Sequence, residues 1–337
     1  MKRLAALLLA CLLRYDTAFA GPINQGAALS LAPGNQVTPI ACTDGSGGAL
    51  IAWLDQRSGP QRIYLHHLLP SQVDPSWPVD GRPLLPGVLS GSQAQPCIVS
   101  DDNAGALICW YDSRHGGADI FAAHIMPDGT IDPSLPLEGT PVCTAPSDQY
   151  DPVLLSDGSG GAFIVWRDNR NEASLSDLYA HHLLSNGTLD PAWPANGTPV
   201  CTATGDQFGV VLVTDDSGGA FANWVDLRSG YEIYGSRLRS AGIDPAVPVN
   251  GFGICTASGN QVSVAAVGNG AGGQIVSWHD DRSGNIDVYA QRVNADNSIA
   301  WVANGVPVCA AQGSQITPAM CSDGSCLLYT SPSPRDS

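Results

Sequence analysis

The chain has 337 residues, a formal net charge of −16 and a single lysine, Lys2. Nucleic acid and anionic membrane surfaces repel so acidic a protein, so we expect it to bind neither. Schiff-base, pyridoxal-phosphate and P-loop chemistry each need an amine, and beyond position 2 the sequence offers none.

Residues 1–20 are predicted to be a secretory signal peptide. Lys2 and Arg3 are followed by an apolar run from Leu4 to Leu13 and by A-F-A before Gly21. The apolar run is too short to span a bilayer. A lipoprotein signal ending at Cys11 is the alternative. We therefore expect a monomer that is secreted or held at the cell surface, without membrane insertion.

A repeat of about 56 residues dominates the rest of the sequence. Five W-x-D-x-R segments occur, at 53–57, 110–114, 166–170, 224–228 and 278–282. A turn acid, or Asn269 in the fifth copy, stands nine residues before each Trp, and a Gln stands eight residues before that position. A period of this length that contains several short apolar runs is typical of propeller blades.

The third copy shows four strand-length runs separated by turn residues. They are 149–156, 162–166, 177–184 and 198–203, and the turn between the first two reads D-G-S-G-G. We call these strands A to D. The prediction is an all-β protein, a β-propeller of four-stranded blades with five full repeats and a truncated sixth. The propeller domain is placed at 21–325, with repeats near 36–92, 93–148, 149–206, 207–260, 261–314 and a partial one at 315–325.

The two ends of the domain bear on ring closure. Residues 24–34 align with strand D of the third copy, so they are predicted to complete the sixth blade and close the ring. The sixth copy begins at Gln315 and breaks off after Asp323. Residues 326–337 read C-L-L-Y-T-S-P-S-P-R-D-S, which resembles a translated sequencing adapter, so this tail is predicted to be non-native. A genuine Pro/Ser-rich tail would leave the ring open.

Candidate ligand-binding residues lie where strand B leads into the B–C loop, on the face where loop length varies. An Asp and an Arg two residues apart project to the same side of a strand, and a ring of such guanidinium groups could hold acidic sugars. The alternative is that each pair anchors its own loop. Gln149 and Gln207 open strand A and could line the axis on the same face. The pairs are Asp55 and Arg57, Asp112 and Arg114, Asp168 and Arg170, Asp226 and Arg228, and Asp280 and Arg282.

Other polar residues give weaker signals. The D-G-S-G-G turns resemble fragments of calcium loops but lack the further acids of a full loop, so Ca²⁺ is the one cofactor considered and none is predicted. Neighbouring strand residues such as His66 and His67 point to opposite faces and cannot chelate one ion. His115 is expected to be a surface residue. Four cysteines share one repeat position and are expected to be small buried side chains, whereas Cys97 and Cys109 have no such relation.

The motifs D-G-S-G-G-A-F-I-V-W-R-D-N-R, D-L-Y-A-H-H-L and G-T-P-V-C-T-A resemble those of bacterial secreted repeat proteins of the β-propeller type, over about residues 24–325. The resemblance implies an extracellular propeller and no catalytic residue. A sialidase Asp box would place its Asp five residues before Trp, whereas here the interval is nine.

We therefore expect a non-catalytic binding or scaffold module that holds an extracellular glycan or protein through the B–C loop face. The alternative is a polysaccharide-acting glycoside hydrolase or lyase of propeller fold, which would use carboxylates and arginines on that face. No unique acid pair stands out of the repeat, which favours binding. A purely structural spacer is the third hypothesis.

Overall fold

The computed structural model describes residues 26–330 except 88–89, 172–174, 317 and 323–327. The predicted signal peptide lies outside this part of the chain, as does most of the predicted non-native tail. The described residues form strands and loops without any helix, and so contain none long and apolar enough to cross a membrane.

The strands form repeated antiparallel sheets, as the repeat predicted, and we call each sheet a blade. The first blade contains β1 (Gln36–Thr43), β2 (Ala49–Asp55), β3 (Arg62–Leu69), β4 (Gln72–Val73) and β5 (Arg82–Pro83). The second contains β6 (Gln93–Ser100), β7 (Ala106–Asp112), β8 (Asp119–Ile125) and β9 (Thr140–Cys143). The third contains β10 (Gln149–Ser156), β11 (Ala162–Asp168), β12 (Asp177–Leu183) and β13 (Thr198–Cys201).

The fourth blade contains β14 (Gln207–Thr214), β15 (Ala220–Asp226), β16 (Glu232–Arg239), β17 (Gly242–Ile243) and β18 (Phe252–Cys255). The fifth contains β19 (Gln261–Gly268), β20 (Gln274–Asp280), β21 (Asp287–Val293) and β22 (Val306–Cys309). Two short strands follow, β23 (Met320–Ser322) and β24 (Leu328–Thr330), which pair with each other.

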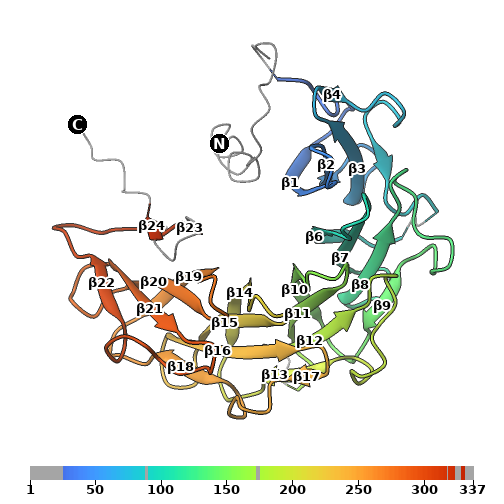
Figure 1. Cartoon of the computed structure of the whole chain (residues 1–337). Helices are drawn as coiled ribbons and strands as arrows, with labels where there is room; N and C mark the ends of the chain where they lie inside the picture. The colour runs from blue at the N-terminus through green and yellow to red at the C-terminus, as the bar shows by residue number, and fades with distance from the viewer. Residues whose placement is uncertain (1–25, 88–89, 172–174, 317, 323–327, 331–337) are drawn as a thin grey trace.

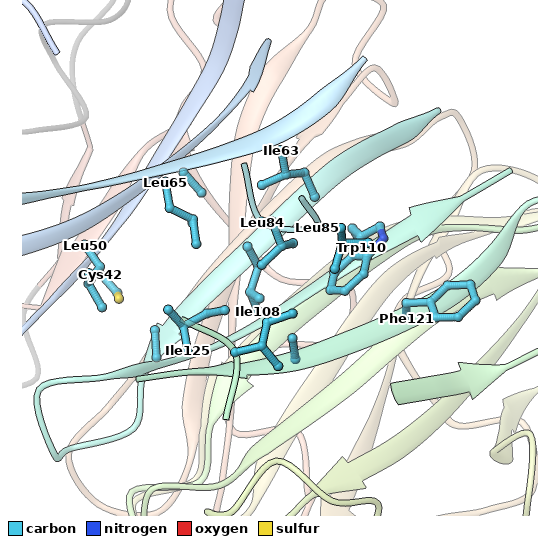
Figure 2. Close-up of a cluster of buried hydrophobic side chains, with 14 of the residues drawn as sticks. Cys42, Leu50, Ile63, Leu65, Leu84, Leu85, Ile108, Trp110, Phe121 and Ile125 are labelled. Carbon is cyan, nitrogen blue, oxygen red and sulfur yellow. The ribbon is translucent and has the colours of Figure 1, made fainter. Parts of the chain in front are cut away.

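The blades follow one another around an arc, with β1, β6, β10, β14 and β19 on its concave side (Figure 1). The hydrophobic core lies between neighbouring blades. Figure 2 shows one such layer, in which Leu50 and Leu65 of the first blade pack against Ile108 and Ile125 of the second. In the second to fifth blades the Trp of the W-x-D-x-R segment also packs against the preceding blade, as Trp166 does against second-blade residues. Central strands that are covered on both faces explain the almost continuous apolar runs in the sequence.

The first strand of each full blade carries a β-bulge two residues after its opening Gln. In β10 the register with β11 shifts between Tyr150 and Val153, and Asp151 between them has φ of 51°. The same position is Thr38, Gln95, Gly209 and Ser263 in the other blades, also with positive φ. A bulge bends the strand and turns a side chain out of the regular alternation. It therefore presents one residue per blade at the concave edge.

The N-terminal segment differs from the prediction. No strand occurs in residues 26–34, the described part of the segment expected to close the ring. It lies against the first blade instead, where Ser30 Oγ accepts a hydrogen bond from Arg57 at 3.2 Å and Leu31 N donates to Asp80. A closing strand D needs a strand C to pair with, and the described residues after 314 supply only β23 and β24.

Candidate functional site

Each predicted Asp–Arg pair forms an ion pair within its own blade. In the third blade Arg170 Nη2 lies 2.5 Å from Asp168 Oδ2, which also accepts a hydrogen bond from Trp166 Nε1 at 2.9 Å. Arg170 then donates to the Asn196 carbonyl, and its guanidinium lies 3.8 Å from the centre of the Tyr179 ring. The pair therefore fastens the B–C loop to the C–D loop. The equivalent ion pairs are Asp55–Arg57, Asp112–Arg114, Asp226–Arg228 and Asp280–Arg282.

In the fourth and fifth blades the contacts of these pairs lower the pKa of the acid. Burial acts to raise the pKa of Asp226, but hydrogen bonds from Arg228 and Trp224 hold that pKa below its ordinary value. The same balance holds the pKa of Asp280 low. Because each guanidinium is already bound to an acid, a carbonyl and an aromatic ring, the geometry matches the loop-anchoring alternative.

Gln149 and Gln207 are also inside the protein. Both side chains are fully buried. Gln149 Nε2 donates to the carbonyl of Ser147 at 3.1 Å, and Gln207 Nε2 donates to that of Gly205 at 3.0 Å. Each amide thus holds the loop that leads into its blade and does not line the axis.

The turn acids are bound by the chain as well. Asp157 Oδ1 accepts the N–H groups of Ser159 and Gly161, at 2.7 and 3.0 Å, while its Oδ2 lies 3.0 Å from His182 Nε2. His182 Nδ1 lies 2.9 Å from Asp190 Oδ2, so one imidazole joins two carboxylates. The D-G-S-G-G segment is therefore a turn that stabilises its own hairpin and the start of the C–D loop.

A different group of residues forms two adjoining shallow pockets between the second and third blades, of about 380 and 470 Å³. The loop from β7 to β8, the loop from β9 to β10 and the start of β10 surround them. The first is lined by Gln95, Tyr111, Ser113, Gly116, Gly117, Ala118, Asp148, Tyr150 and Asp151. The second is lined by His115, Gly116, Gly117, Asp119, Thr144, Ala145, Ser147 and Asp148.

Asp119 is the unusual carboxyl of these pockets. It begins β8 and is 7% exposed. Burial raises its pKa, and so do the negative charges of Asp112 and Asp148, while the charges of His115 and Arg114 oppose them. No hydrogen bond from any described residue reaches the Asp119 carboxyl. A carboxyl in this environment is suited to carry a proton and to donate it.

In the fourth and fifth blades, the acid at the start of strand C accepts a hydrogen bond from a serine in the preceding loop. Asp287 accepts a hydrogen bond from Ser283 at 2.6 Å, and Glu232 accepts one from Ser229 at 2.7 Å. His115 stands at the place of these serines in the second copy, because its loop reads R-H-G where the first, fourth and fifth copies read R-S-G. Asp119 thus lacks a donor that its counterparts have.

Two further acids and two tyrosines complete the pockets. Asp148 lines both of them, is exposed, and accepts the Ala118 N–H at 2.9 Å. Asp151, on the bulge of β10, lies 3.2 Å from Arg167. The Arg167 guanidinium lies 4.8 Å from the centre of the Tyr150 ring and holds that ring at the pocket edge. Burial and the charge of Asp151 raise the pKa of Tyr111.

The sequence contained a signal for this site that the repeat obscured. His115 was read as a surface residue, and it is exposed. Aligning the copies shows, however, that it replaces a serine, and that among the five bulge positions only the one at 151 is an acid. Departures from the repeat, rather than the repeat itself, mark the pockets.

Neither a protein-family model nor a curated protein matches the sequence. Among solved structures, the Hadza microbial sialidase Hz136 is 10% identical with a TM-score of 0.45, and the match covers 80% of this chain and 58% of the sialidase. A thermostable family-43 glycoside hydrolase is 11% identical with a TM-score of 0.40, over 88% of this chain and 100% of the hydrolase. An endo-arabinase from Bacteroides thetaiotaomicron is 12% identical with a TM-score of 0.34, over 82% and 95%.

These comparisons correct the expectation of a non-catalytic binding or scaffold module. The matched structures are named as a sialidase, a family-43 glycoside hydrolase and an endo-arabinase. At such identities and TM-scores the likeness concerns the fold alone, and this chain spans 58% of the sialidase. The chemistry therefore has to be argued from the pockets.

Proposed function

We propose that the chain is a glycoside hydrolase that acts on a neutral polysaccharide at the pockets between its second and third blades. The observation that carries this proposal is the environment of Asp119, where burial and neighbouring acids raise the pKa of one carboxyl beside the exposed carboxylate of Asp148. Glycoside hydrolysis uses such a pair, a protonated acid and an ionised carboxylate.

The roles follow from the contacts of each residue. Asp119 would protonate the oxygen of the leaving sugar, because its carboxyl is the one whose pKa is raised. Asp148 would either activate water or attack the sugar, since it is exposed and lines both pockets. Tyr111 and Tyr150 offer ring faces on which sugars can stack, and Arg167 keeps Tyr150 and Asp151 in place.

The charge of the pockets favours a neutral substrate and a hydrolase over a lyase. The lining residues include Asp119, Asp148 and Asp151 but no arginine, and His115 is the one side chain among them that can become cationic. A lyase that acts on uronic acids has to neutralise the substrate carboxylate, for which arginine is the usual group. Three acids would instead repel an acidic sugar.

The test is release of reducing ends from a panel of neutral and acidic polysaccharides by the wild type, by Asp119→Asn and by Asp287→Asn. Asp287 is the matched control, because it occupies the same repeat position in the fifth blade and is 4% exposed. We expect activity on a neutral polymer that Asp119→Asn abolishes and Asp287→Asn retains. Loss in both variants, or in neither, would contradict the assignment of Asp119.

We further propose that the enzyme is exported, works on extracellular glycan as a monomer, and closes its arc with a sixth blade. The basic and apolar pattern of residues 1–20 supports export, and the start of a sixth copy at Gln315 supports closure. Mass spectrometry of the protein in the culture medium, which would read the mature N-terminus directly, tests export. Protein that stays in the cell fraction and still begins at residue 1 would contradict export.

A further inference from the structure

The second blade brings two cysteines together that show no relation in the sequence repeat. Cys97 in β6 pairs directly with Cys109 in β7 in the antiparallel register. Residues directly opposite each other in an antiparallel pair point to the same face, with Cα atoms about 4.5 to 5.5 Å apart. This separation lies within the range that a disulfide spans, about 4.4 to 6.8 Å. Both thiols are free in the structure.

We propose that Cys97 and Cys109 form a reversible disulfide within the second blade, a redox site next to the candidate active site. Cys97 Sγ lies 3.0 Å from the carbonyl of Pro152, the residue after Asp151. Gln95, two residues before Cys97, accepts the N–H of Asp151 at 3.0 Å. The cysteine pair is thus connected through β6 to the wall of the pocket.

The two thiols are placed for sequential roles in oxidation. Cys97 is partly buried, and a hydrogen bond from the Cys109 thiol lowers its pKa despite that burial. Cys109 is fully buried, and burial raises its pKa well above the ordinary value. Cys97 is therefore the thiolate that attacks an external disulfide, and Cys109 is the thiol that resolves the mixed disulfide.

The reaction needs an oxidant that carries its own disulfide, such as oxidised glutathione or a disulfide-bearing protein. The Cys97 thiolate forms a bond to one sulfur of that disulfide and releases the other as a thiolate. Cys109 then loses its proton, bonds to Cys97 Sγ and releases the second sulfur. Two thiols of this chain lose two protons and two electrons, and the oxidant's disulfide becomes two thiols.

Three other buried cysteines have different surroundings. Cys143 Sγ accepts a hydrogen bond from Arg170 at 3.0 Å, and Cys201 and Cys255 repeat the contact with Arg228 and Arg282. Each packs against the ion pair of the following blade, and their strand registers place no second cysteine opposite them. Cys143→Ser is therefore a matched control for a buried thiol that should not pair.

The test uses the folded protein, incubated with oxidised glutathione and then unfolded in excess iodoacetamide without reductant. A protease that cleaves before Asp cuts at Asp101 and Asp102, between the two cysteines, so 80–100 and 102–111 stay joined only through a disulfide. We expect the joined pair in the wild type and in Cys143→Ser, its absence in Cys109→Ser, and a higher melting temperature for the oxidised wild type. If the oxidised wild type instead yields the two peptides separately, each with its cysteine alkylated, the proposal is overturned.

Discussion

Asp112 and Asp119 face each other across β7 and β8, and only Asp112 has a cation bound to it. Arg114 Nη2 lies 2.5 Å from Asp112, while the Asp119 carboxyl receives no hydrogen bond from a described residue. The negative charge of Asp112 contributes to the raised pKa of Asp119, although the charge of Arg114 opposes it. The acid of the structural Asp–Arg pair therefore helps to raise the pKa of the carboxyl beside it.

The Asp–Arg pairs are predicted to stabilise the blades without taking part in catalysis. Asp168→Ala leaves the Trp166 N–H and the Arg170 guanidinium without their shared partner inside the protein. Breaking a buried ion pair on one side costs about 3 kcal/mol, so the urea midpoint should fall. Leu137→Gln, at an exposed side chain, is the control and should leave the midpoint unchanged.

Gly197 is predicted to be irreplaceable even by alanine. Its φ is +85°, and a Cβ at this position would collide with the ring of Trp166 and with the Ala180 carbonyl. Gly197→Ala should therefore cost about 2 kcal/mol, from backbone strain and from displacement of the Trp ring. Gly158 also has positive φ but open space around it, so Gly158→Ala measures the backbone cost alone. Equal losses in the two variants would show that the contact with Trp166 does not matter.

Acid is predicted to weaken the links between histidines and aspartates. Hydrogen bonds from His67 and Ser76 lower the pKa of Asp74 to about 2, against about 3.9 in an unfolded chain. A lowered folded-state pKa contributes stability above the unfolded value, and this contribution is lost as the pH falls from about 4 to about 2. The difference in free energy of unfolding between wild type and Asp74→Asn should therefore shrink over that interval. A difference that stays constant down to pH 2 would be inconsistent with this contribution.

His115 is predicted to lower the pKa of Asp119 without being essential for activity. The charge of His115 opposes the rise in the pKa of Asp119. In His115→Ala that opposition is lost, so the pKa of Asp119 rises further. Because the proposed acid must be protonated, the alkaline limb of the pH–rate profile should move to higher pH. A shift to lower pH would show that His115 acts in another way.

The sequence predicted the repeated four-stranded antiparallel sheets because the same constraint recurs in every copy. The fixed intervals from Gln to the turn acid and from there to Trp reappear as paired strands with one common register. The ring closure expected from residues 24–34 was not found in the described part of the segment. Aligning this segment with a strand D does not show whether the strand C that it would pair with is present.

The site was harder to predict because it depends on departures from the repeat. Asp119 looks like Asp287 in the sequence, and only the exchange of serine for His115 distinguishes their surroundings. Cys97 and Cys109 lie equally far from the turn at 101–105, so counting outward from that turn would have paired them. The candidate ring of ligand-binding arginines was drawn from spacing alone, which does not reveal that each guanidinium is already bound within its blade.

The most direct test of the account is the pH titration of the Asp119 carboxyl, followed by the ¹³C NMR shift of its carboxyl carbon and assigned by its absence in Asp119→Asn. The account predicts a titration above the ordinary aspartate range of about 4, because burial and the charges of Asp112 and Asp148 disfavour the ionised form. A titration at or below that range would show that Asp119 is ionised like its neighbours, and the assignment of the acid would be wrong.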